Sequence, residues 1–379
     1  MPVSQNTTTQ PVTKNRPNSR TGVAEIVEKI RKQIHQGQWA KGQELPPVRQ
    51  LARKWGVSSN TITAAQSLLE QDGTLRRVAR KGVFVCDSSE LREKPVLLIG
   101  HMNQNAKGEN WSQRVTLGTL EELNRRQMKF NWPQWERPTD GSDWEEACKI
   151  IMQHKDQISG VILAWAICSE TQMQQMVQAI GKPIIKVGRY CRKCFHNFVS
   201  VDHFEAGNIV AQHTRHLIND RVLILSGHAP HDFPRRQLIE GFMDGLLEHH
   251  ESLVHCDAMQ LASVQEEDCH KAIKAYLENN PMPQVVYASG DLLAIRAMNA
   301  LQALGHRVPA DVSVVSSTGL DLAQVCTPTL AHVRQPLEDL GTQAVALLDR
   351  LIDTPGHWGP GVELPVTWQS GQSIGPETI

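Results

Sequence analysis

Residues 44–73 limit what this chain can fold into more than any other segment. Pro46 and Pro47 stand where a helix can begin, because a proline in the first turn loses no hydrogen bond that the helix needs. Gly56 then ends that helix, since glycine adopts a left-handed backbone at little cost. The segment predicts two short helices joined by a tight turn, a helix-turn-helix whose second helix can enter the major groove of DNA.

Apolar residues recur at helical spacing in both predicted helices. They are Val48, Leu51, Ala52 and Trp55 in the first, and Ile62, Ala65, Leu68 and Leu69 in the second. Ser58 or Ser59 can cap the second helix by accepting hydrogen bonds from its free backbone N–H groups. The opposite face carries Ser59, Asn60 and Thr63. The alternative, an ordinary helical hairpin in a core, agrees less well with the flanking sequence.

The flanking sequence predicts a winged domain. Residues 23–36 place apolar side chains along one side of a helix, at Val23, Ile26, Val27, Ile30 and Ile34. Residues 75–85 are short β-prone runs around a basic tip, which predicts a hairpin, or wing. Arg80, Lys81 and Gly82 form that tip, where the cations can reach phosphates or the minor groove. A solvated basic turn is the alternative for the tip alone.

This arrangement resembles the winged helix-turn-helix of the gluconate-repressor (GntR) family over residues 22–86. The matching segments are residues 37–46, 49–52, 56–58, 60–61, 69–70, 73 and 81–85. The resemblance implies that Arg49, the start of the recognition helix at Ser58, Ser59 and Asn60, and the wing near Gly82 contact DNA. Thr61 and Thr63 of the same helix and Arg80 and Lys81 of the wing tip are further candidates. The family often has arginines where this chain has Ser59 and Thr63, and this difference leaves the operator sequence open.

Charge is divided unevenly along the chain. Residues 1–89 hold 14 Lys and Arg against 6 Asp and Glu, which leaves 25 against 34 in the rest. The net charge of −1 therefore conceals a basic N-terminal part and an acidic remainder. A basic part suits contact with phosphates, so we expect DNA binding that weakens as salt is added.

Other features of the sequence bear on the class of protein. No hydrophobic signal segment and no stretch long enough to span a membrane is evident, so we expect a cytoplasmic protein without a membrane partner. Its eight cysteines are then reduced thiols. Cys191, Cys194 and His196 have a metal-like spacing, but no second pair stands at a finger spacing. We expect no metal, no cofactor and, without a nucleophile–base or P-loop signature, no enzyme.

The rest of the chain alternates apolar runs with helical patterns. Strands are predicted at residues 95–100, 160–164, 183–188, 221–226, 284–289 and 312–315, and helices at 112–127, 170–180, 205–218, 235–249, 291–304 and 336–352. Such alternation is typical of an α/β fold, in which helices cover both faces of parallel sheets. Ligands of these folds bind beyond the carboxyl ends of the strands.

Several segments here resemble the effector-binding part of the lactose/galactose-repressor (LacI/GalR) family, which is similar to periplasmic sugar-binding proteins. They are residues 199–207, 240–242, 288–294, 305–315, 327–328 and 333–336. The resemblance implies two Rossmann-like lobes, a sugar-like effector in the cleft and a homodimer. A gluconate-type DNA-binding domain joined to such a sensor is similar to the arabinose-repressor arrangement.

These patterns predict four parts of the chain. They are a disordered tail at residues 1–21, rich in Thr, Asn, Pro, Gln and Ser, a winged helix-turn-helix at 22–87, a polar linker at 88–95 and a two-lobed effector-binding and dimerisation domain at 96–379.

The effector-site residues carry over from the resemblance only in part. The candidates are Trp111, Ser112, Arg189, Asp202, Arg235, Arg236, Asp291, Thr318 and Asp321. Trp111 falls where the family places an aromatic pair over the ligand, and it can stack on a sugar. The family's ligand arginine corresponds to Leu238 and its ligand aspartate to Thr318. Losing a bidentate cation and a hydroxyl acceptor argues for a less usual sugar or another ligand.

We therefore expect a ligand-responsive, DNA-binding regulator of transcription, acting as a dimeric repressor. An effector that closes the cleft would alter the spacing of two winged domains on a palindromic operator. One alternative is a regulator whose sensor has lost its ligand and responds to a protein partner or to nothing. Another is a cofactor-dependent enzyme fused to the DNA-binding domain, as in some gluconate-type regulators, but no cofactor lysine in its fold context is evident.

Overall fold

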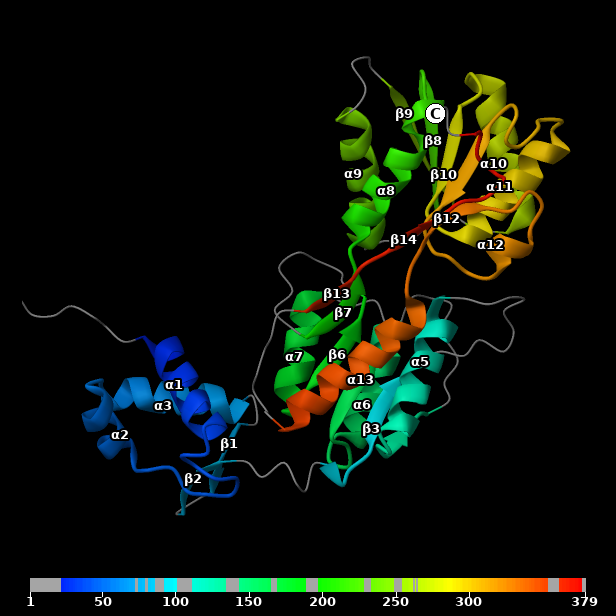
Figure 1. Cartoon of the computed structure of the whole chain (residues 1–379). Coiled ribbons are helices and arrows are strands. Elements are labelled where there is room, and N and C mark those ends of the chain that lie inside the picture. The colour runs from blue at the N-terminus through cyan, green and yellow to red at the C-terminus, as the bar shows by residue number, and fades with distance from the viewer. Residues whose placement is uncertain are drawn as a thin grey trace, which may run out of the picture. The chain divides into compact units, whose positions relative to one another are not determined.

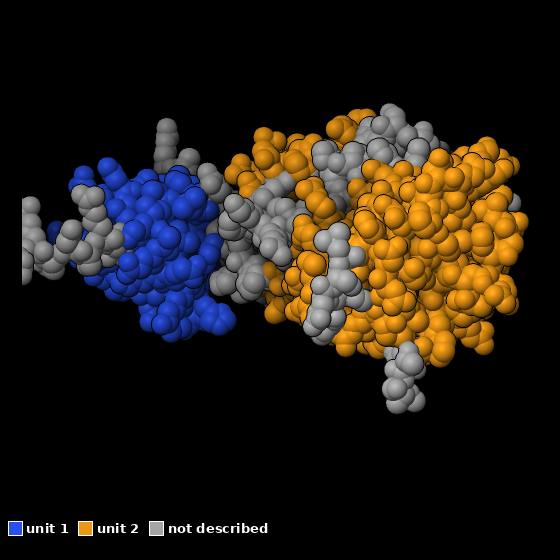
Figure 2. Space-filling model, turned by 90° about the horizontal axis from the view of Figure 1, so that it is seen from above, with its two compact units in different colours: residues 1–86 blue, residues 87–379 orange. Residues whose placement is uncertain are grey.

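The computed structural model describes residues 22–71, 74–78, 81–85, 92–100, 111–133, 143–164, 169–188, 197–227, 233–248, 254–261, 263, 265–353 and 361–376. The chain divides into two compact units, Met1–Cys86 and Asp87–Ile379 (Figure 2). Among the predicted site residues, Arg80 and Arg189 lie outside the described residues, as do Cys191, Cys194 and His196.

The first unit is a winged helix-turn-helix, as the sequence predicts. Its elements are α1 (Val23–His35), α2 (Val48–Trp55), α3 (Ser59–Gln71), β1 (Leu75–Val78) and β2 (Gly82–Val85) (Figure 1). β1 and β2 form the antiparallel hairpin of the wing. The apolar stripes of the helices meet in one core, in which Ile26, Ile30, Leu51, Ile62 and Leu69 are fully buried.

The turn between α2 and α3 has the backbone geometry that the sequence predicts. Gly56 is left-handed with φ of 66°, and the amide of Val57 donates to the Ala52 carbonyl at 3.1 Å. Of the two serines that could cap α3, it is Ser58 whose hydroxyl accepts from the backbone N–H of Thr61, at 3.1 Å. This bond satisfies an amide that the first turn of the helix leaves without an intrahelical partner.

The second unit has two lobes, each built on a sheet. The first lobe's sheet has the order β13-β7-β6-β5-β3-β4, with the strands β3 (Val96–Ile99), β4 (Phe130–Asn131), β5 (Gly160–Leu163), β6 (Ile184–Val187), β7 (Phe198–Val201) and β13 (Val362–Leu364). The second lobe's sheet has the order β14-β12-β11-β10-β8-β9, with β8 (Arg221–Gly227), β9 (His255–Leu261), β10 (Val285–Ala288), β11 (Ser313–Ser316), β12 (Ala331–Arg334) and β14 (Thr367–Gln369). All neighbours are parallel except β12 and β14.

Helices cover both faces of each sheet because alternate strand residues point to opposite sides. In β3, Val96 and Leu98 pack towards α5 (Trp111–Arg125) and α13 (Leu337–Asp353), whereas Leu97 and Ile99 pack towards α6 (Asp143–His154) and α7 (Glu170–Ile180). In the second lobe, alternate residues of β8 likewise pack towards helices on opposite faces of the sheet. Its helices are α8 (His203–Thr214), α9 (Phe233–Leu247), α10 (Glu266–Asn279), α11 (Asp291–Ala303) and α12 (Leu322–Val325).

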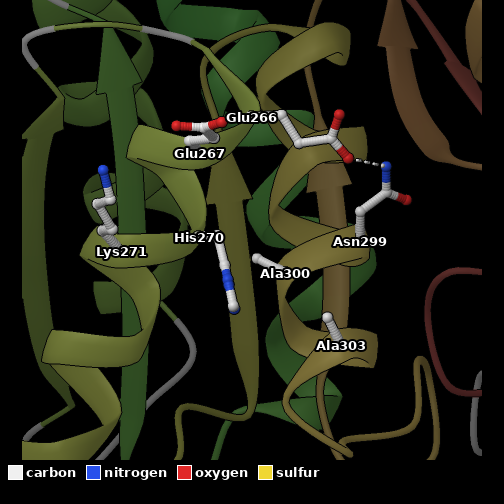
Figure 3. A pocket seen from close by; sticks show the side chains of 7 residues that line it. All are labelled: Glu266, Glu267, His270, Lys271, Asn299, Ala300 and Ala303. Atoms are coloured by element: carbon white, nitrogen blue, oxygen red, sulfur yellow. Dashed lines mark hydrogen bonds between the residues drawn. The ribbon is translucent and has the colours of Figure 1, made fainter.

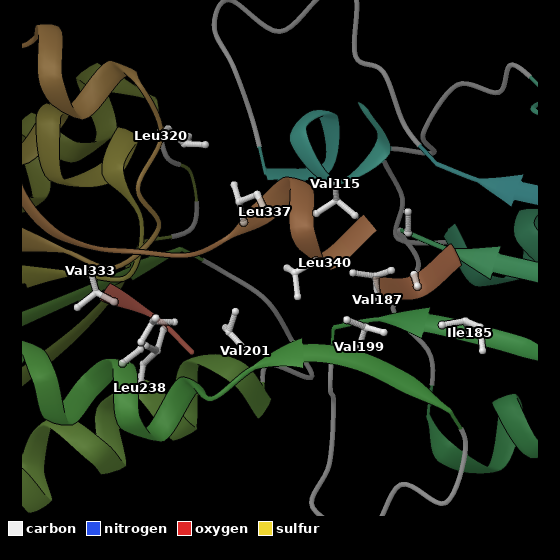
Figure 4. Close-up of a cluster of buried hydrophobic side chains, with 14 of the residues drawn as sticks. Val115, Ile185, Val187, Val199, Val201, Leu238, Leu320, Val333, Leu337 and Leu340 are labelled. Carbon is white, nitrogen blue, oxygen red and sulfur yellow. The ribbon is translucent and has the colours of Figure 1, made fainter. Parts of the chain in front are cut away.

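In the described residues the chain passes between the lobes three times: after β7, between β12 and α13, and between β13 and β14. α13 therefore packs in the first lobe although it follows the strands of the second (Figure 1). A single apolar cluster extends along these crossings, from Val199 and Val201 to Val333 and Leu337 (Figure 4).

Some elements differ from the sequence prediction. The helix expected at residues 205–218 starts earlier, at His203, because the Asp202 carboxylate caps it by accepting from the Glu205 amide at 3.0 Å. It ends at Thr214 and continues as a short 3₁₀ turn, η1 (Arg215–Leu217). The elements β4, β7, β9, β12, β13, β14, α6, α10 and α12 were not predicted.

Candidate functional site

The exposed start of α3 is the candidate surface for reading DNA bases. Ser59, Asn60 and Thr63 are exposed there, on the side away from buried Ile62. The Thr63 hydroxyl is less available than the others to donate a hydrogen bond to a base, because Thr63 Oγ1 donates to the Ser59 carbonyl at 3.0 Å. The end of α3 that would enter a groove is therefore lined by small polar side chains.

Two other predicted contact residues serve the helix itself. Ser58 Oγ and Thr61 Oγ1 share a hydrogen bond of 2.8 Å, and Ser58 also accepts from the Thr61 amide. Their hydroxyls thus close the first turn of α3, in which Ser58 is exposed and Thr61 is half-buried. Arg49, exposed in the first turn of α2, adds a cation to the same domain.

The wing is tied to the chain that leads into α2. The Leu45 amide donates to the Val83 carbonyl at 2.7 Å, and the Val85 amide to the Gln43 carbonyl at 2.8 Å. Gly82 has φ of 127°, and a Cβ there would collide with the Glu44 carboxylate. The positive φ favours glycine at this position, next to the exposed Lys81 at the tip of the hairpin.

In the two-lobed domain, three polar contacts bring distant residues together at the crossing before α13. Trp111 Nε1, from the first lobe, donates to Gln335 Oε1 at 3.2 Å. Gln335 Nε2 donates to the carbonyl of Ser317 at 2.8 Å, and the backbone N–H of Gln335 donates to the carbonyl of Thr318 at 3.1 Å. Ser317 and Thr318 lie just beyond the carboxyl end of β11, and such folds bind ligands at this edge of the sheet.

Asp291 differs from its expected role. It is 1% exposed, and its carboxylate accepts hydrogen bonds from Ser316 Oγ and from the Leu320 amide, both at 2.5 Å. Burial raises the pKa of this carboxyl, while those hydrogen bonds oppose the shift. Asp291 therefore fixes the loop after β11 from inside the lobe, and these contacts favour a structural role over ligand contact.

Leu238 of α9 stands where the resemblance places a ligand-binding arginine, and two arginines precede it in the same helix. Leu238 is buried, and its carbonyl lies against Gly207 of α8, where a Cβ would collide. Arg235, one turn earlier, donates from Nη1 to Ser226 Oγ at 3.0 Å and to the Gly227 carbonyl at 2.9 Å. Arg235 therefore places a cation at the carboxyl end of β8, whereas Arg236 is exposed.

The remaining candidates occupy varied positions. Ser112 is buried beside Trp111 in α5, and Asp202 is exposed but caps α8. Thr318 is half-buried next to Gln335, and Asp321 pairs with Arg114 of the first lobe at 3.3 Å. The structure thus groups Trp111, Thr318 and Asp321 about the crossing, together with Gln335, which the sequence analysis did not single out.

A hollow of about 360 Å³ lies elsewhere, between α10 and α11 (Figure 3). Its lining residues are Glu266, Glu267, His270, Lys271, Asn299, Ala300 and Ala303. None of the predicted effector residues lines it, and α10 and α11 cover the opposite face of the sheet from α8 and α9. It does not belong to the candidate effector site.

Two further findings concern only the described residues. No group of three or more His, Cys, Asp or Glu side chains there is arranged to hold a metal ion. In the same part of the chain, every helix is too short or too polar to cross a membrane.

Comparison with known families agrees with this architecture. Residues 23–85 match the bacterial regulatory proteins of the gntR family, and residues 214–374 match the periplasmic binding protein-like domain. The chain thus combines a gntR-family winged helix-turn-helix with a periplasmic-binding-protein-like domain.

The curated relatives are regulators of transcription rather than enzymes. The ribose operon repressor of Halalkalibacterium halodurans is 26% identical over 198 residues, 52% of this chain and 56% of that protein. The probable repressor ExuR of Bacillus subtilis is 32% identical over 120 residues, 32% of this chain and 36% of its own. The chain therefore spans about half the length, or less, of these relatives.

Solved structures show the same fold. A LacI family regulator from Enterococcus faecium with bound ribose has a TM-score of 0.62 at 19% identity, over 75% of this chain and 99% of its own. The complex of the regulator CelR with cellobiose has a TM-score of 0.60 at 20% identity, over 87% of this chain and all of that one.

Proposed function

We propose that this protein is a DNA-binding regulator of transcription whose operator affinity is set by a small molecule bound between the two lobes. The union of a winged helix-turn-helix and a two-lobed sensor in one chain carries this proposal. The proposed division is a tail at residues 1–21, a winged domain at 22–87, a linker at 88–95 and a sensor at 96–379. Its DNA target puts the protein in the cytoplasm.

In this proposal the first turn of α3 reads bases and the cations around it bind phosphates. Ser59 and Asn60 supply short hydrogen-bonding groups at the exposed helix start, and the capping hydroxyls hold its backbone in place. Arg49 and Lys81 flank this surface with charges that phosphates attract. Small side chains leave more of the specificity to the wing and to DNA shape.

A sugar or a related polyhydroxylated molecule is the proposed effector. Relatives of the same fold carry ribose or cellobiose in their solved structures, and one curated relative is a ribose operon repressor. Trp111 offers a flat apolar face for a ring, and Arg235 and Thr318 offer hydroxyl-binding groups at strand ends.

Repression by a homodimer follows from the same reasoning. A palindromic site needs two winged domains at a fixed spacing, and a pair of two-lobed domains can supply that spacing. An effector that favours one lobe arrangement shifts the population of dimers that fit the operator.

A thermal-shift screen against sugars, sugar phosphates, polyols and nucleosides tests the sensor. A ligand at a hundred times its dissociation constant stabilises the folded state by about 2.7 kcal/mol, so a true effector raises the unfolding temperature clearly. If no compound from these classes stabilises the chain, the sensor assignment fails, and a regulator that responds to a protein partner replaces it. Sedimentation then tests the dimer, which a strict monomer with and without DNA would exclude.

A further inference from the structure

Arg114 of α5 lies between two carboxylates that belong to different lobes. Its Nη1 is 3.3 Å from Oδ1 of Asp321, which stands where the second lobe's chain enters α12. Its Nε pairs with Glu338, in the first turn of α13, which packs on α5 in the first lobe. The Arg114 side chain is 13% exposed, so this cation is largely enclosed.

The second-lobe side of this contact is held firmly in place. Buried Asp291 accepts from the Leu320 amide, and Gly319, with φ of 81°, lies so close to Arg334 that a Cβ would collide with its backbone. The Asp321 carboxylate makes no hydrogen bond that caps α12. It is therefore presented to Arg114 by a loop that the lobe interior anchors.

The first-lobe side leads to the linker. α13 carries Glu338 near its start and Asp349 near its end, about 16 Å apart along a helix. Asp349 accepts from Arg126 of α5 at 2.7 Å and pairs with Arg92 at 3.1 Å. Arg92 lies within the predicted linker at residues 88–95 and is the first described residue of it. The helix α13 thus touches the contact between the lobes at one end and the predicted linker at the other.

We propose that Arg114 is an interlobe latch, which holds the loop of residues 318–321 against α13 and thereby couples the arrangement of the lobes to the linker at Arg92. Asp291 and Asp321 are its positioning residues in the second lobe. The latch is a property of the folded chain, whereas its regulatory consequence rests on the proposed function.

An arginine suits this position because its planar fork meets two carboxylates at once, which a lysine ammonium does less well. Without that cation, nothing from Arg114 offsets the like charges of Asp321 and Glu338, which both pair with it. The loss of attraction and the gain of repulsion therefore act in the same direction and favour separation of the loop from α13.

Hydrogen–deuterium exchange of the full chain tests the latch without any ligand. In Arg114→Gln, the backbone amides of residues 319–324 and of Gln335, Leu337 and Glu338 should exchange about threefold faster or more, as expected from loss of a partly enclosed ion pair. Arg125→Gln is the matched control, since Arg125 lies on the same helix, is 68% exposed and pairs with Glu122 of that helix. It should leave both segments unchanged.

A second variant, Asp321→Asn, shows whether faster exchange in Arg114→Gln comes from the lost contact or from a general loss of folding. Asp321→Asn alters a side chain that is 68% exposed, and it should reproduce the faster exchange of residues 319–324. The double variant should exchange no faster than the quicker single one, because both remove the same contact. Unchanged exchange in both single variants, or equal effects in the Arg125 control, would overturn the latch.

The same samples separate the latch from the proposed function. If the wild-type chain binds no DNA but the exchange results hold, the proposed function fails and the latch stands. If DNA binding and an effector are established, Arg114→Gln should shift the effector concentration for half-maximal DNA release by about threefold or more. An unchanged effector response would overturn the coupling to the linker.

Discussion

Trp111 Nε1 donates a hydrogen bond to Gln335 Oε1 at 3.2 Å, although the two residues are 224 positions apart in the chain. Trp111 begins α5 of the first lobe, whereas Gln335 lies on the crossing and also donates to the Ser317 carbonyl in the second. Gln335 is 6% exposed. The aromatic side chain expected over a ligand is thus oriented by an amide that contacts both lobes, so its position depends on how the lobes are arranged.

We expect Trp111→Ala to weaken binding of an effector by about tenfold or more, because an indole face contributes on the order of 1.4 kcal/mol or more to a stacked ring. Operator binding should stay nearly intact, since residue 111 lies outside the winged unit. Calorimetry with the ligand found by thermal shift measures the loss. Trp368→Ala, which removes an indole stacked on His213, is the control. Equal affinity in wild type and Trp111→Ala would place the ligand elsewhere.

We expect Gly241→Ala to lower the free energy of unfolding of the second unit by about 1–3 kcal/mol. A Cβ at Gly241 would meet the backbone of Phe204, because α8 and α9 cross at close range. Alanine favours the helix by up to about 1 kcal/mol, which the collision outweighs. Urea denaturation measures the change. Gly290→Ala serves for comparison, since its Cβ meets nothing nearer than Thr318 Oγ1 at 3.6 Å.

Glu122 should make unfolding depend on pH in the acid range. Hydrogen bonds from Arg125, and to a lesser degree from Arg126, lower the pKa of this buried carboxyl from 4.5 to about 2, against the effect of burial. A depressed pKa in the folded state contributes stability above pH 4.5, and that contribution is lost as the pH falls towards 2.

Urea denaturation at a series of pH values tests this contribution. The free energy of unfolding of Glu122→Gln should fall less between pH 4.5 and pH 2 than that of the wild type. Parallel curves for the two proteins would show that the Arg125 and Arg126 contacts do not act on the folded state as inferred.

The elements that the sequence predicts are those with strong apolar periodicity. β3, β5 and β10 are buried on both faces and consist of continuous apolar runs, and β6 is interrupted only by the buried Lys186. By contrast, β9 is an edge strand in which buried and exposed positions mix, and only Cys269 and Ile273 are buried in α10. Such segments carry little hydrophobic signal, so tertiary contacts decide their structure.

The candidate site is harder to predict because it depends on the crossings between the lobes. Gln335 gains its role only when the chain brings Trp111 and Ser317 to it. Asp291 has the residue type of a ligand-binding acid, yet the Leu320 amide folds over it and closes it off. The chemistry of a side chain was readable from the sequence, but its exposure was not.

DNA binding by the winged unit is the central claim, and a salt titration tests it most directly. The binding constant for a fixed duplex, selected from random sequence with the wild-type chain, should be measured by fluorescence anisotropy at several salt concentrations. Lys271→Ala with Lys274→Ala removes the same charge from exposed positions of α10 and is the control. Arg49→Ala with Lys81→Ala should weaken binding and make the slope of log K against log salt shallower by about 2, at about 0.9 per lost phosphate contact. Affinity and slope equal to those of the wild type in this double variant would contradict the assignment of the α2–α3 surface and the wing to DNA.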